Sequence, residues 1–307
     1  MIYKRKIYEK IKKVVDHKNA IIIIGGRQVG KTTLMRQLYN DLPDDQKVWF
    51  DFDNPIEYKF FQEIDYSDIP VKLEQRGLSR KKRKYVFIDE IQSFPEITKI
   101  MKYLIDHYKI KFIVSGSASY YLQNLFPESL SGRKFLFKLN PLSFNEFLLF
   151  NGRVKDLKPK SVLDKSNKSI VDYEEFDQEY QEYKDWGGYP EVVLEDDPSL
   201  KEMILKNIFS SYFEKDVIKF GDFREVDKIR DLILLLASRV GSKLDITKIS
   251  SEIGVSRNTI YSQLTFLEAT FFVSLLPKYS KSVDRKKAGS KKIYFADSGM
   301  LNQLSQV

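Results

Sequence analysis

The fold is decided by the stretch Ala20-Ile21-Ile22-Ile23-Ile24-Gly25-Gly26-Arg27-Gln28-Val29-Gly30-Lys31-Thr32-Thr33. Its first five residues form an apolar run that is too short for a buried helix and is typical of a buried strand. Two glycines interrupt the run, and the residues after Gly30 favour a helix. The strand, loop and helix provide the context that the pattern G-x-x-x-x-G-K-[ST] requires.

This spacing predicts a loop that holds phosphate groups. Gly25 and Gly30 permit a tight turn whose backbone N–H groups face phosphate oxygens, beside the positive end of the following helix. Lys31 would reach the β- and γ-phosphates, and Thr32 would give its hydroxyl to Mg²⁺. The alternative is a glycine turn with a chance Lys-Thr. The predicted nucleotide-binding residues are Gly25, Gly26, Arg27, Gln28, Val29, Gly30, Lys31, Thr32 and Thr33.

A second motif, Tyr85-Val86-Phe87-Ile88-Asp89-Glu90, is an apolar strand that ends in two carboxylates. Acidic residues close many strands, so the motif gains its meaning from the phosphate loop upstream. In that combination Asp89 is expected to hold Mg²⁺ through its water shell, and Glu90 to polarise the attacking water. The two motifs together predict hydrolysis of a nucleotide.

Two further groups are candidates for catalysis. The apolar run 110–114 leads into Ser115-Gly116-Ser117-Ala118-Ser119, where a sensor for the γ-phosphate is expected, and Ser115 is the residue we assign to it. A helix N-cap made by Ser117 or Ser119 is the alternative. Arg133 precedes the strand 134–139 and is either an arginine finger, in its own site or a neighbour's, or the partner of a surface carboxylate.

The order of these elements predicts an α/β fold. Five strands that alternate with helices indicate a parallel sheet with helices on both faces and the ligand at the carboxyl ends of the strands. One strand is expected between the phosphate-loop strand and the strand that ends in Asp89 and Glu90. This is the additional-strand type of P-loop NTPase.

The rest of the chain divides by composition. Residues 150–200 are polar and acidic and indicate a flexible insertion, and helices are expected at 199–216 and 225–240. Residues 245–261 have a helix-turn-helix rhythm, and two strands at 271–276 and 292–295 would complete a winged helix. Its use in packing or protein contacts is the alternative to DNA binding. The predicted DNA contacts are Arg257, Asn258 and Tyr261 in the groove, and Lys281, Arg285, Lys286 and Lys287 on phosphates.

The composition excludes or disfavours several kinds of site, location and partner. The 307 residues include no cysteine and two histidines, which excludes disulfides and cysteine nucleophiles and argues against a zinc site. The charged start lacks the apolar core of a signal peptide, and no apolar run is long enough to span a membrane, so we expect a cytoplasmic protein. The net charge of +8 fits either a nucleic-acid partner or a lysine-rich solvated surface.

The motifs also resemble those of a known family. Residues 25–33, Phe87-Ile88-Asp89-Glu90-Ile91-Gln92, Ser115-Gly116-Ser117, Ser131-Gly132-Arg133 with Leu139-Asn140-Pro141-Leu142-Ser143, and Gly187-Gly188-Tyr189-Pro190 are similar to archaeal and bacterial AAA-type (AAA+) ATPases with a C-terminal domain of unknown function. The resemblance implies nucleotide contacts at Gly30, Lys31, Thr32, Asp89 and Glu90. It also implies a nuclease-like fold after residues 292–299, so this chain is expected to be a fragment or to lack that domain.

These observations lead to one interpretation and two rivals. We predict an ATPase domain at 1–150, an acidic insertion and helical lid at 151–235, a winged helix at 236–296 and the start of a truncated domain at 297–307. The function would be Mg²⁺-dependent ATP hydrolysis coupled to a DNA-contacting winged helix, with a homo-oligomer as a further partner. The first rival is a nucleotide-gated DNA-binding or regulatory module with little or no hydrolysis. The second is a small-molecule kinase, which would leave the winged helix without a purpose.

Overall fold

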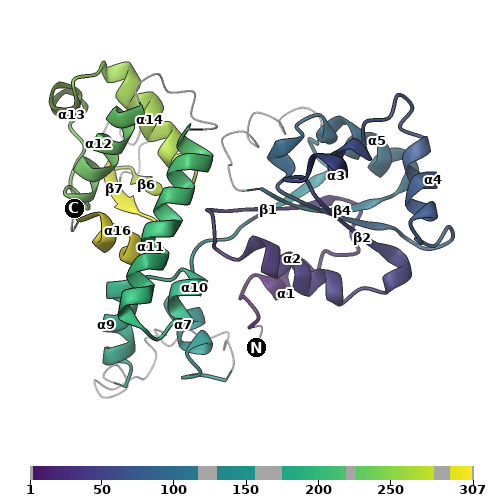
Figure 1. The fold of residues 1–307 in the computed structure, drawn as a ribbon, viewed down its shortest axis with the longest axis horizontal. Coiled ribbons are helices and arrows are strands. Elements are labelled where there is room, and N and C mark those ends of the chain that lie inside the picture. The colour runs from purple at the N-terminus through teal and green to yellow at the C-terminus, as the bar shows by residue number, and fades with distance from the viewer. Residues whose placement is uncertain (1–2, 117–129, 156–174, 219–225, 280–290, 306–307) are drawn as a thin grey trace. The chain divides into compact units, whose positions relative to one another are not determined.

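The computed structural model describes residues 3–116, 130–155, 175–218, 226–279 and 291–305 (Figure 1). The chain forms two compact units. The first consists of residues 1–26 and 30–139, and the second of residues 27–29 and 140–307. Three residues of the phosphate loop, 27–29, therefore group with the second unit.

The first unit is built on a five-stranded parallel sheet with the order β2-β3-β4-β1-β5. Each strand is short and rich in β-branched or aromatic residues. The three inner strands, β1, β3 and β4, are buried throughout, as expected for strands packed on both faces, whereas the outer strands β2 and β5 are partly exposed. The predicted parallel sheet is confirmed, and β4 lies between β1 and β3. The strands are β1 (Ala20–Ile24), β2 (Lys47–Asp51), β3 (Tyr85–Asp89), β4 (Lys111–Gly116) and β5 (Lys134–Lys138).

Helices cover this sheet on both sides, with α1 and α2 on one side and α3 and α5 on the other (Figure 1). Helix α5 shows why: its buried residues include Ile97, Met101 and Leu104, which recur at the helical period and form its inner face. The helices are α1 (Tyr8–Lys12), α2 (Lys31–Asn40), α3 (Pro55–Lys59), α4 (Asp68–Gln75) and α5 (Ile97–Tyr108).

The amino-terminal helix is shorter than its amphipathic pattern suggests. The pattern favours a helix up to residue 18, but α1 ends at Lys12 and turns follow. The buried Lys111 ammonium donates hydrogen bonds to the carbonyl oxygens of Val14 (3.1 Å), His17 (2.9 Å) and Asn19. Bonds to this buried cation replace helical hydrogen bonds, so tertiary contacts override the local preference.

The second unit is mostly helical. The expected flexible insertion is wrong for residues 177–193, where α9 and α10 form. The few apolar side chains of α9 are aromatic and pack against other elements. The ring centroids of Tyr183 and Phe147 lie 5.3 Å apart, and the Tyr183 hydroxyl donates to Leu142 O at 2.7 Å. The helices are α7 (Phe144–Phe150), α9 (Asp177–Trp186), α10 (Pro190–Val193), α11 (Pro198–Tyr212) with a π-helical continuation Phe213–Ile218, α12 (Val226–Ala237), α13 (Ile246–Ile253), α14 (Arg257–Ala269) and α16 (Ser298–Ser305).

In the core of this unit, a close backbone contact at a glycine and hydrogen bonds to one buried carboxylate join segments that lie far apart in the sequence. Leu142 N donates to Gly188 O at 2.6 Å, and a side chain at Gly188 would overlap the Leu142 backbone. Asp297 accepts hydrogen bonds from Gly188 N (2.7 Å) and Met300 N (2.9 Å). Burial raises the pKa of Asp297 to about 6, although these backbone donors oppose the shift.

The helix-turn-helix segment forms as its cap residues indicate. Asp245 accepts from Lys248 N at 3.0 Å and starts α13, and Ser256 accepts from Thr259 N at 3.1 Å and starts α14. Strands β6 (Val273–Leu276) and β7 (Lys292–Phe295) then pair antiparallel. The interpretation of these elements as a winged helix stays a prediction. Among the described residues, no helix is long and apolar enough to cross a membrane.

Candidate functional site

The predicted catalytic residues meet at the carboxyl edge of the parallel sheet. In the register of the sheet, Ile24 of β1 lies beside Gly116 of β4, and Ile88 of β3 lies beside Val114 of β4. The phosphate loop follows β1, Glu90 follows β3, and Ser115 lies near the end of β4. This edge is where parallel α/β sheets bind ligands.

The phosphate loop adopts the backbone conformation that its glycines allow. Gly30 has φ +93° and caps α2, and Gln28 is also left-handed at +57°. Val29 is buried, while Gln28 and Thr33 are exposed. Such left-handed steps turn successive N–H groups toward one side of a loop, which creates a concave binding site for anions.

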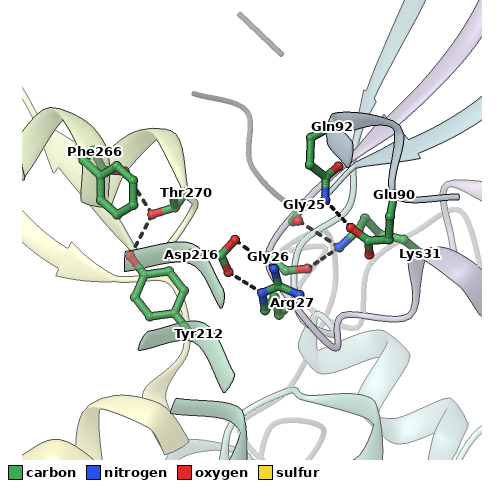
Figure 2. Close-up of polar contacts among 10 residues, drawn as sticks. All are labelled: Gly25, Gly26, Arg27, Lys31, Glu90, Gln92, Tyr212, Asp216, Phe266 and Thr270. Carbon is green, nitrogen blue, oxygen red and sulfur yellow. Dashed lines mark hydrogen bonds and ion pairs between the residues drawn. The ribbon is translucent and has the colours of Figure 1, made fainter. Parts of the chain in front are cut away.

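Lys31 bends back over this loop (Figure 2). Its Nζ atom donates to Gly26 O at 2.7 Å and to Gly25 O at 3.1 Å, and the residue is 6% exposed. These backbone oxygens compensate for the burial of the ammonium, so the loop holds a positive charge in a fixed place.

Two predicted residues donate hydrogen bonds from their side chains to the Asp89 carboxylate. Thr32 Oγ1 donates to Asp89 Oδ2 at 2.6 Å, and Ser115 Oγ donates to Asp89 Oδ1. Asp89 and Ser115 are both buried. A hydroxyl oxygen beside a carboxylate is the ligand set that Mg²⁺ prefers, so these residues fit that ion. Ser115 orients the carboxylate, whereas the γ-phosphate role assigned to it stays a prediction.

Glu90 lies beside this group in a conformation unusual for its residue type. Its φ of +53° is left-handed, and its N–H lies 3.2 Å from Asp89 Oδ1. Backbone strain of this kind recurs at functional sites, where it aims a side chain. The Glu90 carboxylate accepts a hydrogen bond from Gln92 Nε2 (Figure 2). Gln92 belongs to the sequence motif, but its contact with Glu90 could not be predicted from it. The contact depends on the turn Ile91–Ser93, which brings the Gln92 side chain back toward Glu90.

Arg27, a residue of the phosphate loop, pairs with a residue far along the chain. Its guanidinium forms a two-pronged ion pair with Asp216, with Nε to Oδ2 at 2.5 Å and Nη2 to Oδ1 at 3.2 Å. Both residues belong to the second unit. Sequence reasoning missed Asp216 because 189 positions separate the partners and no local motif marks it.

Arg133 lies at the amino-terminal ends of the strands, opposite to the ends where the predicted catalytic residues meet. Because β5 runs parallel to β1, with Lys134 beside Ala20, Arg133 lies about 16 Å from the phosphate-loop end of that strand. Its Nε donates to Asp106 Oδ1 at 2.7 Å. The structure does not bring Arg133 to the site of its own chain, which corrects that alternative. A role in a neighbour's site stays a prediction.

The predicted DNA contacts stay a prediction, and the structure describes the placement of three of them. Arg257, Asn258 and Tyr261 are exposed on the first turns of α14, with Tyr261 57% exposed. The residues Lys281, Arg285, Lys286 and Lys287 lie outside the described residues, as do Ser117 and Ser119.

Comparison with known proteins agrees with this division of the chain. Residues 17–148 match the model of a family described as an AAA domain. Residues 177–307 match a domain of unknown function. The first match contains the whole sheet and every residue of the carboxyl edge discussed above.

Individual proteins extend the similarity over nearly the whole chain. An uncharacterized protein of Haemophilus influenzae is 29% identical over 290 residues, which cover 91% of this chain and 67% of the relative. An uncharacterized protein of Methanocaldococcus jannaschii is also 29% identical, with 92% of this chain and 61% of the relative covered. The chain thus spans about two thirds of the length of these relatives.

A solved structure shares the fold. The Walker-type ATPase of Pyrococcus abyssi superposes with a TM-score of 0.63 at 14% identity and covers 99% of this chain and 96% of its own. At that identity the likeness concerns the fold alone. The family match and the shared fold agree with a P-loop fold of the AAA type at residues 17–148, and residues 177–307 match a domain of unknown function.

Proposed function

We propose that this protein binds Mg²⁺ and ATP at the carboxyl edge of its sheet and hydrolyses the γ-phosphate bond. The observation that carries the proposal is the convergence of Lys31, Thr32, Asp89 and Glu90 at one edge, from two stretches that lie far apart in the sequence. Structural roles alone give no reason for two acidic groups, a buried lysine and an anion-binding loop to share that edge.

Each residue has a definite task in this mechanism. The loop N–H groups and Lys31 bind the triphosphate, with phosphate oxygens replacing Gly25 O and Gly26 O around the ammonium. Thr32 and Asp89 hold Mg²⁺, which neutralises negative charge on the phosphate oxygens when it is bound. Glu90 orients the attacking water and accepts its proton, while Gln92 fixes the direction of the Glu90 carboxylate.

ATP is proposed over GTP because the sequence contains no Asn-Lys-x-Asp motif of the kind that reads guanine. The experiment is steady-state phosphate release by the purified protein, with Mg·ATP and Mg·GTP compared, and with EDTA as a control. Lys31→Ala should abolish tight binding of Mg·ATP in calorimetry, since the loop loses its cation. Unchanged affinity in that variant would overturn the assignment of the loop.

A second candidate is a nucleotide-gated DNA-binding module with little hydrolysis. It is favoured by the exposed first turns of α14, where Arg257, Asn258 and Tyr261 present polar groups for a groove. Anisotropy with labelled duplex DNA, titrated across salt concentrations and with each nucleotide, separates the two. Nucleotide-dependent DNA affinity without phosphate release supports the module. DNA-independent turnover supports the ATPase.

A further inference from the structure

The three inner strands of the first unit begin in segments that are rich in basic side chains. Segments 16–19, 79–84 and 109–111 lead into β1, β3 and β4, which are adjacent in the sheet. They contain eight basic residues and one acidic residue, Asp16. We call these three segments the basic end of the sheet. Its basic residues are Lys18, Arg80, Lys81, Lys82, Arg83, Lys84, Lys109 and Lys111.

Hydrogen bonds hold the three segments together. The Arg83 guanidinium donates to His17 O at 3.0 Å and to Asp16 O. Lys111 Nζ donates to the same His17 O at 2.9 Å, and the Lys111 N–H donates to Lys84 O at 2.9 Å. The cations are therefore gathered at one place in the fold rather than scattered along the chain.

The positive charge of the basic end is poorly compensated. Burial lowers the pKa of Lys111, and repulsion by Arg83, which shares a carbonyl oxygen with it, adds to this shift. Asp16, the one carboxylate in the three segments, acts in the opposite direction. Carbonyl groups solvate these two cations but do not cancel their charge, so a positive field extends into the solvent.

Four further cations at this end are exposed. Among the described residues, Lys18, Arg80, Lys81 and Lys109 form no ion pair, and each side chain faces the solvent. The two remaining lysines of segment 79–84 differ, because they pair with carboxylates at 2.7 and 3.1 Å. Exposed cations without a carboxylate partner are available to the phosphates of a nucleic acid.

Aromatic rings lie beside two of these cations. Tyr108 is 40% exposed and precedes Lys109, and the exposed His17 precedes Lys18. The two pairs lead into β4 and β1, neighbouring strands that lie about 4.8 Å apart. Proteins bind single-stranded nucleic acids with this combination, because cations contact the phosphates while rings stack on unpaired bases. An acidic protein segment offers the rings no planar bases.

We propose that the basic end binds single-stranded nucleic acid without sequence preference. Its exposed cations contact phosphates and its exposed rings stack on bases, neither of which distinguishes one base from another. The surface lies at the opposite ends of the strands from Lys31 and Asp89, and its binding requires no nucleotide. The proposed contacts are Lys18, Arg80, Lys81 and Lys109 for phosphates, and His17 and Tyr108 for bases.

The test is the affinity of a fluorescein-labelled oligothymidylate, measured by fluorescence anisotropy across salt concentrations and without ATP. Lys81→Gln/Lys109→Gln should weaken binding about tenfold or more at low salt, and the slope of log K against log[salt] should become shallower by about 1.4. The matched control, Lys59→Gln/Lys99→Gln, removes the same charge from exposed lysines of α3 and α5. It should bind nearly as the wild type does.

Several outcomes would overturn the proposal. Absence of binding by the wild type removes the site, and equal losses in the two double variants point to net charge alone. Unchanged binding by Lys81→Gln/Lys109→Gln places the nucleic-acid contact elsewhere, for example on α14. Tighter binding of a duplex, or equal binding of labelled polyglutamate, excludes single strands as the partner. Because ATP is absent, none of these results bears on the proposed hydrolysis.

A second measurement requires no variant. Acetylation of the wild-type lysines, followed by mass spectrometry, should become slower at Lys18, Lys81 and Lys109 when oligothymidylate is added. It should stay constant at Lys59 and Lys99, and equal changes at all five lysines contradict the proposal.

Tyr108→Leu tests the stacking. This variant keeps an apolar side chain without a ring, so it should weaken binding of oligothymidylate and leave the salt slope unchanged, because stacking releases no counterions. Unchanged affinity in Tyr108→Leu would contradict the assignment of the ring and, with it, single strands as the partner.

Discussion

Two buried lysines lie at opposite edges of one parallel sheet, and they surround their ammonium groups in the same way. Lys31 is 6% exposed and donates to two backbone carbonyls, while Lys111 is fully buried and donates to three. The acceptors of Lys31 belong to the glycine loop of the proposed nucleotide site. Those of Lys111 belong to the chain leading into β1. The same local chemistry therefore lies in the proposed ligand site at one end of the strands and in chain packing at the other.

The largest effect of a substitution is expected at Glu90, at the carboxyl ends of the strands, where turnover and nucleotide binding should respond differently. Glu90→Gln keeps the shape but cannot accept a proton, so ATP should still bind while turnover falls by roughly 10²–10⁴-fold. Phosphate release and calorimetry, run on the same protein, separate the two steps. Turnover near that of the wild type would make Glu90 a structural residue and leave the position of the water to other groups.

At the amino edge, the expected effect is on folding. Lys111→Met fills similar space but removes one donor from each of three carbonyl oxygens. Val14 O keeps the His17 N–H and His17 O keeps the Arg83 guanidinium, so the loss falls mainly on Asn19 O and should lower the free energy of unfolding by about 1–3 kcal/mol. Urea unfolding measures this, and nucleotide affinity of the folded variant should match the wild type. Loss of nucleotide binding at a temperature where the variant is folded would break the comparison between the two edges.

The pH dependence of stability sharpens the account of Lys111. Burial lowers the pKa of Lys111 to about 7, with a smaller contribution from Arg83. The unfolded chain then keeps this proton up to about pH 10.5, whereas the folded chain releases it near pH 7. The free energy of unfolding of the wild type, relative to Lys111→Met, should therefore rise from pH 7 toward pH 10. A constant difference would show that the three carbonyls hold the proton against burial.

The smallest effect is expected at an exposed ion pair near the amino-terminal ends of the strands. The Arg133–Asp106 pair has side chains 36% and 33% exposed, so Asp106→Asn should change stability by about 0–1 kcal/mol and leave turnover unaltered. Thermal unfolding and phosphate release measure both quantities.

Arg133→Ala asks a different question at the same edge. We expect turnover close to that of the wild type, because Arg133 lies far from the site of its own chain. A loss of activity that is restored by mixing with Lys31→Ala protein would contradict this expectation and place Arg133 in a neighbour's site.

The residues that meet at the carboxyl ends of the strands could be predicted because they belong to short sequence motifs. Gly30, Lys31, Thr32 and Asp89 follow from spacing that a phosphate site requires, and the alternation of strands with helices predicts how they meet. The loss of helix after Lys12 was not predictable, since it depends on a lysine of β4 almost a hundred residues later.

Contacts made by single side chains across long separations were equally hidden. Asp216 lies in a segment whose helical pattern says nothing about Arg27. Helix α9 has too little apolar periodicity to reveal itself, because its packing depends on the rings of a few tyrosines. Patterns report the average environment of an element, whereas these features depend on one partner each.

The glycines around Asp297 set a limit on how this chain can vary. At Gly187, Gly188 and Gly299 an added methyl group would overlap Asp297, Leu142 or Trp186, and at Gly187 the backbone is also left-handed, with φ +77°. Only a hydrogen atom fits at each position, so a survey of all single substitutions should find these three sites among the least tolerant in the protein.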